Sequence, residues 1–403
     1  MKKSMILLLG VMLLLPYIVN ASSGMLNEYE DVETISETDT LASSELIPSA
    51  KSGLLMEAST GKIVFEKEKD LRVSVASMTK MMLQIIVLEH IESGKIKWED
   101  MVTTSPEASS LGGSQLFLSP GEEMTVLELF KGVSMASAND ASVALAEHIS
   151  GSEKEFVKIM NEKVKQLNLK NTKFKNSTGL DEEDHYSSAY DMAIIAQELL
   201  KHEKILEFSS LYEDYLRVDT KENFWLVNTN KLVRFYEGAD GLKTGFTDDA
   251  MYCLAATAKR GDLRFIAIVL GVETGKIRNA ETMKLLDYGF AHYQMEVLKK
   301  QDEIIERINL EKSDKKQLEV RAVQDVSVLV NKAEEKRRFT YDIKLDELTL
   351  PIKKGDTVGK IEIKEDNKII HTVSLISNTN AKPIGFGQLY LKILKETFMG
   401  EFK

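Results

Sequence analysis

The chain has 403 residues, of which 43% are hydrophobic, enough apolar material for two or three domains with buried cores. Its net charge of −11 provides no basic surface of the kind that nucleic-acid binding needs, so we expect no nucleic acid among its partners. A single cysteine, Cys253, excludes an intramolecular disulfide, a cysteine-based metal site and a redox-active thiol pair.

The first residues have the pattern of a secretory signal peptide. Two lysines precede an apolar run from Met5 to Val19, and Ala21 lies at a plausible cleavage point. Because the run is short for a membrane span, we expect residues 1–21 to be removed during export; an uncleaved N-terminal anchor is the alternative. Residues 22–45 contain many Glu, Asp, Ser and Thr but no Lys or Arg, which predicts an acidic disordered linker.

Residues 46–293 combine strand and helix signals. A β-hairpin is predicted over 53–65, with a turn at Ser59-Thr60-Gly61, and strands are predicted over 251–258 and 263–270. Helical patterns cover residues 77–91, 125–134, 140–149, 153–167, 190–202 and 279–293, and the second begins with a capping box formed by Thr125 and Glu128. Because the strand signals lie at both ends of the region with helices between them, we expect one α+β domain.

The pattern changes after residue 296. Short alternating runs predict a separate, small all-β domain over 297–380, with strands at 318–322, 326–330, 339–343, 348–352, 358–363 and 369–375. In residues 384–403 apolar side chains recur on one helical face, and Lys, Gln and Glu on the other. This predicts an amphipathic helix that lies in a membrane surface; a terminal helix packed on its own domain is the alternative.

Three short motifs carry side chains suited to nucleophilic catalysis. Ser77-Met78-Thr79-Lys80 places a hydroxyl and an amine one helical turn apart, so that Lys80 can take the Ser77 proton if its pKa is lowered. Ser137-Ala138-Asn139 falls in a break between two predicted helices, where Asn139 either points into a cleft or caps the next helix. Lys243-Thr244-Gly245 adjoins the predicted strand pair, and its glycine would let a ligand backbone approach closely.

Taken in this order, the three motifs resemble those of the penicillin-recognising serine acyl-transferases. More closely, several segments look like those of the D-alanyl-D-alanine carboxypeptidases of the penicillin-binding protein 5 type: Ala76–Met82, Ser137–Ala141, Asn171–Phe174, Gly179-Leu180, His185–Ala189, Asp191–Ala193 and Asp240–Thr247. The resemblance covers nearly the whole exported chain. It implies a β-lactamase/transpeptidase-like catalytic domain, with an antiparallel sheet, flanking helices and a helical subdomain, followed by a small β-domain and a C-terminal amphipathic helix.

The resemblance also implies an activity: removal of the terminal D-alanine from peptidoglycan stem pentapeptides, without cofactor or metal, by an enzyme that β-lactams inhibit. In this family pattern Ser77 is the nucleophile and Lys80 its general base, with Lys243 as the cation that keeps the pKa of Lys80 low. Asn139 would hold Lys80 and the substrate amide. Ser137 would relay a proton to the departing amine.

Substrate binding follows from the same resemblance. Lys243, Thr244, Gly245 and Phe246 would contact the substrate, with its terminal carboxylate against Lys243 and Thr244. The backbone N–H groups of Ser77 and Phe246 would form the oxyanion hole. The family often has an arginine before this motif, where the present chain has Asn228-Thr229-Asn230-Lys231, and Arg234 is a candidate to replace it.

Other activities remain open on the sequence. A serine β-lactamase would need an acidic residue to activate water, and residues 182–184 are acidic, although a polar loop of this kind is typically solvated. A DD-endopeptidase and a non-catalytic wall-binding module are further alternatives. The six histidines are scattered without metal-ligand spacing. We expect an exported protein on the outer face of the bacterial cytoplasmic membrane, peripherally bound, whose partners are stem peptides, β-lactams and the membrane surface.

Overall fold

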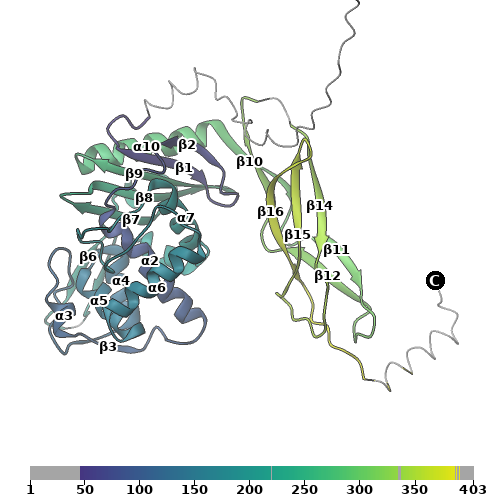
Figure 1. Cartoon of the computed structure of the whole chain (residues 1–403), viewed down its shortest axis with the longest axis horizontal. Coiled ribbons are helices and arrows are strands. Elements are labelled where there is room, and N and C mark those ends of the chain that lie inside the picture. The colour runs from purple at the N-terminus through teal and green to yellow at the C-terminus, as the bar shows by residue number, and fades with distance from the viewer. Residues whose placement is uncertain (1–45, 219, 335–336, 386, 388–389, 391–403) are drawn as a thin grey trace, which may run out of the picture. The chain divides into compact units, whose positions relative to one another are not determined.

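The structure is a computed structural model of the whole chain and describes residues 46–218, 220–334, 337–385, 387 and 390 (Figure 1). The predicted signal peptide, the acidic linker and nearly all of the predicted amphipathic helix lie outside these residues. Among the helices of the described part, none is both long and apolar enough to cross a membrane.

A five-stranded antiparallel sheet forms the frame of residues 46–292. Its strand order is β2-β1-β9-β8-β7. The strands are β1 (Ser52–Glu57), β2 (Ile63–Lys67), β7 (Ala239–Thr247), β8 (Met251–Arg260) and β9 (Leu263–Val272). The predicted hairpin is β1–β2, and β1 pairs with β9 although about two hundred residues separate them, with Leu55 opposite Ala267. The strand that carries Lys243-Thr244-Gly245 is β7, at one edge of the sheet.

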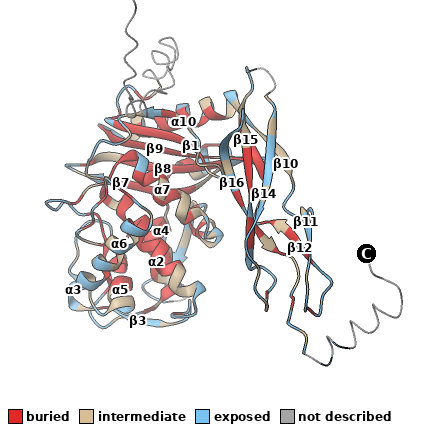
Figure 2. Cartoon of the chain, turned by 45° about the vertical axis from the view of Figure 1, so that its right-hand side comes forward, coloured by how far each residue is buried: buried red, intermediate tan, exposed pale blue. Residues whose placement is uncertain are grey.

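Alternate residues of β9 belong to two different hydrophobic cores, one on each face of the sheet. Ile266 and Ile268 belong to the core beneath α7 (Ala189–Leu200), whereas Ala267 and Val269 face α10 (Gly275–His292). Figure 2 shows the buried central strands between these two helices. Burial on both faces explains the continuous apolar runs of β8 and β9.

The helical part contains the predicted helices, with one important difference. The helix predicted over 77–91 is divided into a 3₁₀ turn, η1 (Ala76–Thr79), and α2 (Lys80–Glu92). The other helices are α3 (Pro106–Ser109), α4 (Val126–Met135), α5 (Asn139–Ser150), α6 (Glu153–Gln166), η2 (Glu203–Ile205), α8 (Leu206–Ser209) and α9 (Leu232–Phe235). The predicted capping box at the start of α4 is present, with Thr125 and Glu128 as its two partners.

Two small antiparallel strand pairs in this region were not predicted. They are β3 (Met101–Thr103) with β4 (Glu123–Thr125), and β5 (Glu213–Leu216) with β6 (Phe224–Val227). Their strands are three or four residues long, which is too short for a clear alternating pattern.

The β-domain has a sheet of order β11-β12-β16-β15-β14 and a separate strand pair, β10–β13. Its strands are β10 (Tyr293–Lys299), β11 (Glu306–Asn309), β12 (Gln317–Ala322), β13 (Val326–Asn331), β14 (Phe339–Leu345), β15 (Thr357–Glu365) and β16 (Lys368–Ser377). The strand predicted over 348–352 is wrong: within it, Ile352 makes an isolated bridge to Ala381. Pro351 lacks the N–H that a paired strand needs, which accounts for the difference.

Candidate active site

The first two predicted site residues meet through the 3₁₀ turn. In this geometry residues three apart stand one above the other, so Lys80 lies over Ser77. Lys80 Nζ is 2.8 Å from Ser77 Oγ and 2.7 Å from Asn139 Oδ1, and the lysine is fully buried. Asn139 does not cap α5: Ala138 is the N-cap, without a side-chain bond, and Asn139 Nδ2 donates to the carbonyl oxygen of Gly112. The capping alternative is therefore wrong.

Close backbone contacts hold η1 in place. Ala76 and Ser137 are non-glycine residues with positive φ angles of 48° and 64°, a conformation that is costly unless the surrounding structure enforces it. At Gly245 on β7, an added Cβ would lie 2.6 Å from the carbonyl oxygen of Val75. The sequence suggested that this glycine admits a ligand backbone, and the structure shows that the chain's own residues 75–77 approach it.

Burial and repulsion between cations lower the pKa values of both site lysines. The pKa of Lys80 lies well below its usual value, first because of burial and then because of the nearby charge of Lys243, while Asp140 and Glu153 act in the opposite direction. Burial, followed by repulsion from Arg278, lowers the pKa of Lys243 to about 7. The pKa of Lys243 thus lies near neutral pH, and the pKa of Lys80 is displaced in the same direction.

A pocket of about 480 Å³ opens in front of these lysines. Its lining includes six of the predicted residues: Ser77, Ser137, Asn139, Thr244, Gly245 and Phe246. Lys80 and Lys243 are buried at 0% and 1% exposure behind this lining, and Lys243 Nζ donates to Thr244 O at 3.0 Å. The structure thus brings the predicted catalytic and substrate-binding residues of the three motifs together.

Several lining residues were missed from the sequence, and Arg278 and Thr229 are two of them. Arg278, near the start of α10, is 7% exposed, and its guanidinium donates to Asn279 Oδ1 at 2.8 Å. Thr229 accepts a hydrogen bond from Thr244 Oγ1 at 2.8 Å. Arg234, the candidate from the sequence, instead stacks on Tyr212 at 4.7 Å and does not line the pocket.

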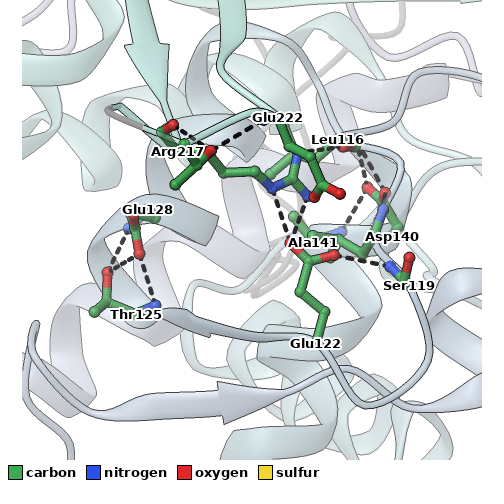
Figure 3. Close-up of polar contacts among 11 residues, drawn as sticks. Leu116, Ser119, Glu122, Thr125, Glu128, Asp140, Ala141, Arg217 and Glu222 are labelled. Carbon is green, nitrogen blue, oxygen red and sulfur yellow. Dashed lines mark hydrogen bonds and ion pairs between the residues drawn. The ribbon is translucent and has the colours of Figure 1, made fainter.

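The loop on one side of the pocket is held from two directions. Asp140, 1% exposed, accepts the backbone N–H of Leu116 at 3.0 Å. Arg217 donates to the carbonyl oxygen of the same residue at 3.1 Å and pairs with Glu122 at 2.7 Å, and these contacts are drawn in Figure 3. Both interactions stabilise the segment that contains the lining residues 113 and 114.

Within the described residues there is no group of three or more His, Cys, Asp or Glu side chains suited to holding an ion. His185 is buried, its Nε2 lies 2.8 Å from Thr79 Oγ1, and burial lowers its pKa to about 4. The acidic residues 182–184 are exposed and do not line the pocket.

A serine hydroxyl against a buried lysine, with an asparagine beside them and a lysine-threonine-glycine strand along the pocket, defines the class of penicillin-recognising serine enzymes. The comparisons with known proteins narrow this class. Residues 39–274 match the family described as D-alanyl-D-alanine carboxypeptidase, and residues 293–382 match the penicillin-binding protein 5 C-terminal domain. The chain belongs to the D-alanyl-D-alanine carboxypeptidase family.

Individual relatives agree with this assignment. The chain is 48% identical to D-alanyl-D-alanine carboxypeptidase DacF of Bacillus subtilis over 360 residues, which cover 89% of this chain and 91% of DacF. Penicillin-binding protein 5 of Haemophilus influenzae is 33% identical, with a TM-score of 0.65 over 83% of this chain and 98% of that structure. Penicillin-binding protein D2 of Listeria monocytogenes, solved in an ampicillin-bound form, is 31% identical, with a TM-score of 0.55 over 60% of this chain and 98% of that structure. The protein is a serine D-Ala-D-Ala carboxypeptidase of the penicillin-binding protein 5 type that acts on peptidoglycan.

Proposed function

We propose that this carboxypeptidase works through an acyl-enzyme on Ser77, with Lys80 as the general base. The observation that carries the proposal is the 2.8 Å contact between Lys80 Nζ and Ser77 Oγ, made by an amine that is fully buried. Burial and Lys243 lower the pKa of Lys80, and this favours the neutral amine that would accept the hydroxyl proton.

In this proposal Ser77 Oγ attacks the carbonyl carbon of the penultimate D-alanine while its proton moves to Lys80 Nζ. The backbone N–H groups of Ser77 and Phe246 stabilise the oxyanion. The peptide C–N bond then breaks, and the departing D-alanine amine receives a proton through Ser137, which lines the pocket. Water hydrolyses the remaining ester and restores the Ser77 hydroxyl.

The terminal carboxylate of the substrate binds at the β7 side of the pocket. Thr244 presents its hydroxyl there, Lys243 lies just behind it, and Arg278 adds a second cation. Because β7 is an edge strand, an extended peptide can lie alongside it as an additional strand. Two cations and an unpaired strand edge together favour a peptide that ends in a carboxylate.

A β-lactam presents a reactive amide and a carboxylate in a similar arrangement, and we propose that it acylates Ser77. The ampicillin-bound form of the Listeria relative supports this idea. The ring-opened product stays attached to the acyl group, so it cannot leave as D-alanine does. We expect a long-lived adduct.

The proposal includes a location. The signal-peptide pattern of residues 1–21 and the amphipathic pattern of residues 384–403 support an exported enzyme bound peripherally to the outer face of the cytoplasmic membrane. Pelleting with anionic vesicles would test the second part. Chain 22–403 should pellet and chain 22–383 should stay in solution; equal pelleting of the two would contradict the anchor.

The test of the catalytic proposal is intact mass measurement after brief exposure to benzylpenicillin, with D-alanine release from a D-Ala-D-Ala peptide assayed in parallel. Wild type should gain one penicillin on Ser77 and release D-alanine, and Ser77→Ala should do neither. Ser59→Ala is the control, because Ser59 belongs to the other Ser-x-x-Lys of the same domain and lies in the β1–β2 turn. Fast penicillin hydrolysis without D-alanine release would indicate a β-lactamase, and cleavage of crosslinked dimers in preference to pentapeptide an endopeptidase.

A further inference from the structure

The residues between α6 and α7 form a wall of the site that lies outside the three catalytic motifs. Thr178 O accepts a hydrogen bond from Lys80 Nζ at 2.7 Å. The next residue, Gly179, packs so closely on η1 that an added Cβ would lie 1.9 Å from Ala76 O. The position of this short segment therefore affects both the general base and the backbone beside the nucleophile.

The third contact of Lys80 matters for proton transfer. A neutral amine has two N–H donors and one lone pair, whereas the ammonium form has three donors. Asn139 Oδ1 and Thr178 O, both at 2.7 Å, accept the two N–H groups of the neutral form. The lone pair is then directed at the remaining neighbour, Ser77 Oγ, at 2.8 Å.

Glu153 holds the wall from behind. It is the first residue of α6, and its Oε1 accepts both the backbone N–H of Ser177 at 2.8 Å and the Ser177 hydroxyl at 2.5 Å. Ser177 is fully buried and directly precedes Thr178. On the other side, Asn176 Oδ1 accepts the N–H of Gly179 at 2.7 Å. The carboxylate thus fixes the peptide that carries the acceptor of Lys80.

We propose that Glu153 is a positioning residue for proton abstraction: through Ser177 it fixes Thr178 O, which together with Asn139 directs the Lys80 lone pair at Ser77 Oγ. This inference rests on the proposed roles of Ser77 and Lys80. Glu153 touches neither the substrate nor the reacting atoms, and nothing in the three motifs points to it.

The charge of Glu153 has a second effect. The charged groups around Lys80 are Lys243 from β7, Asp140 from α5 and Glu153 from α6; the first lowers the pKa of Lys80 and the two carboxylates raise it. Removal of the Glu153 charge lowers the pKa of Lys80 further. Acylation, which needs neutral Lys80, should then persist to lower pH.

The experiment measures the acylation rate of the full exported chain by benzylpenicillin as a function of pH and of penicillin concentration. Glu153→Gln keeps an oxygen acceptor for Ser177 but loses the charge, so its maximal rate should stay within about threefold of wild type while the acid limb moves to lower pH. Glu153→Ala loses the acceptor, and its maximal rate should fall at least about tenfold because the base is misplaced. The half-saturating penicillin concentration should stay within about twofold in both variants, since the residues proposed to bind the penicillin carboxylate are unchanged.

Glu155→Gln is the matched control. Glu155 lies on the same helix, is exposed and pairs with Lys158, so its rate and pH profile should equal those of wild type. Acylation of Glu153→Ala at the wild-type rate, or an unmoved acid limb in Glu153→Gln, would overturn the proposal. Failure of the underlying mechanism gives a different result, because wild type itself would then carry no adduct on Ser77.

Discussion

The two domains of this chain differ in how they treat charge in the interior. The catalytic domain buries three basic side chains at its pocket: Lys80, Lys243 and Arg278. The core of the β-domain consists of aliphatic residues from β12, β13, β15 and β16. Among the described residues of that domain the one buried charged side chain is Glu362, which pairs with Lys360 at 2.8 Å.

The buried basic groups of the catalytic domain are unfavourable for its stability but are needed for the proposed mechanism. Burying an ionised basic group costs several kcal/mol, so a group of buried basic side chains is unfavourable for folding alone. The same burial lowers the pKa of Lys80, as the proposed role of general base requires. The β-domain core contains no comparable group, and we interpret it as structural. The predictions below test this contrast.

The largest effect is expected at the buried base. In Lys80→Arg the side chain stays cationic at all accessible pH values, so it cannot accept the Ser77 proton, and acylation by benzylpenicillin should slow by more than about a thousandfold. Stopped-flow acylation measures the rate. Lys154→Arg, at an exposed position of α6, should behave as wild type. A rate for Lys80→Arg within tenfold of wild type would contradict the assignment of the base.

In the β-domain a large stability change should leave catalysis intact. Ile361 is fully buried in the aliphatic core, so Ile361→Ala should destabilise the domain by about 2–5 kcal/mol. Hydrogen exchange of residues 357–377 should report the loss, while kcat/KM on a soluble D-Ala-D-Ala peptide stays within about twofold. Ile370→Ala, at a side chain that is 44% exposed, is the control for exchange. A large loss of peptide activity in Ile361→Ala would contradict the interpretation that the β-domain is structural and takes no part in catalysis.

Buried His185 should make the catalytic domain acid-sensitive. Its folded pKa of about 4 is below the unfolded value of 6.5, so the unfolded state binds more protons between these values, and stability falls as pH decreases from 6.5 to 4. The loss attributable to this residue is about 2–3 kcal/mol. Both tryptophans, Trp98 and Trp225, lie in this domain, so urea unfolding followed by their fluorescence measures it.

The comparison for this prediction is His185→Gln, which can still donate to Thr79 but does not titrate. Its stability should depend less on pH in the window from 6.5 to 4 than that of wild type. His148→Gln removes an exposed histidine and should retain the wild-type slope. Equal slopes in wild type and His185→Gln would show that this histidine is not the cause.

A smaller effect is expected at Arg278. The pKa of Lys243 is about 7 partly because Arg278 repels its charge, so Arg278→Gln should raise that pKa and move the alkaline limb of kcat/KM to higher pH. KM for the peptide should also rise, by about tenfold, because one carboxylate contact is lost. Arg234→Gln should change neither quantity, since Arg234 stacks on Tyr212 away from the pocket. If the alkaline limb of kcat/KM does not move in Arg278→Gln, the idea that Arg278 lowers the pKa of Lys243 is wrong.

Local patterns predicted most of the fold correctly. The β1–β2 hairpin, the capping box at Thr125 and the alternating strands of the β-domain depend on neighbours within a few residues, which the sequence contains directly. The errors have equally local causes. Residues 348–352 alternate like a strand but include Pro351, and the β5–β6 hairpin is too short to show a period.

By itself the sequence identified the residues that we propose carry the chemistry of this protein: a serine, two lysines and an asparagine in three motifs whose spacing depends on one turn or one strand. Only the tertiary structure decided what surrounds them. Arg278 lines the pocket from α10, and Thr178 O accepts a hydrogen bond from Lys80. Glu153, at the start of α6, accepts the backbone N–H of Ser177 beside that carbonyl. A backbone carbonyl carries no residue-specific signal in the sequence. Burial is likewise a property of the packed molecule, and burial is the first cause of the lowered pKa of Lys80.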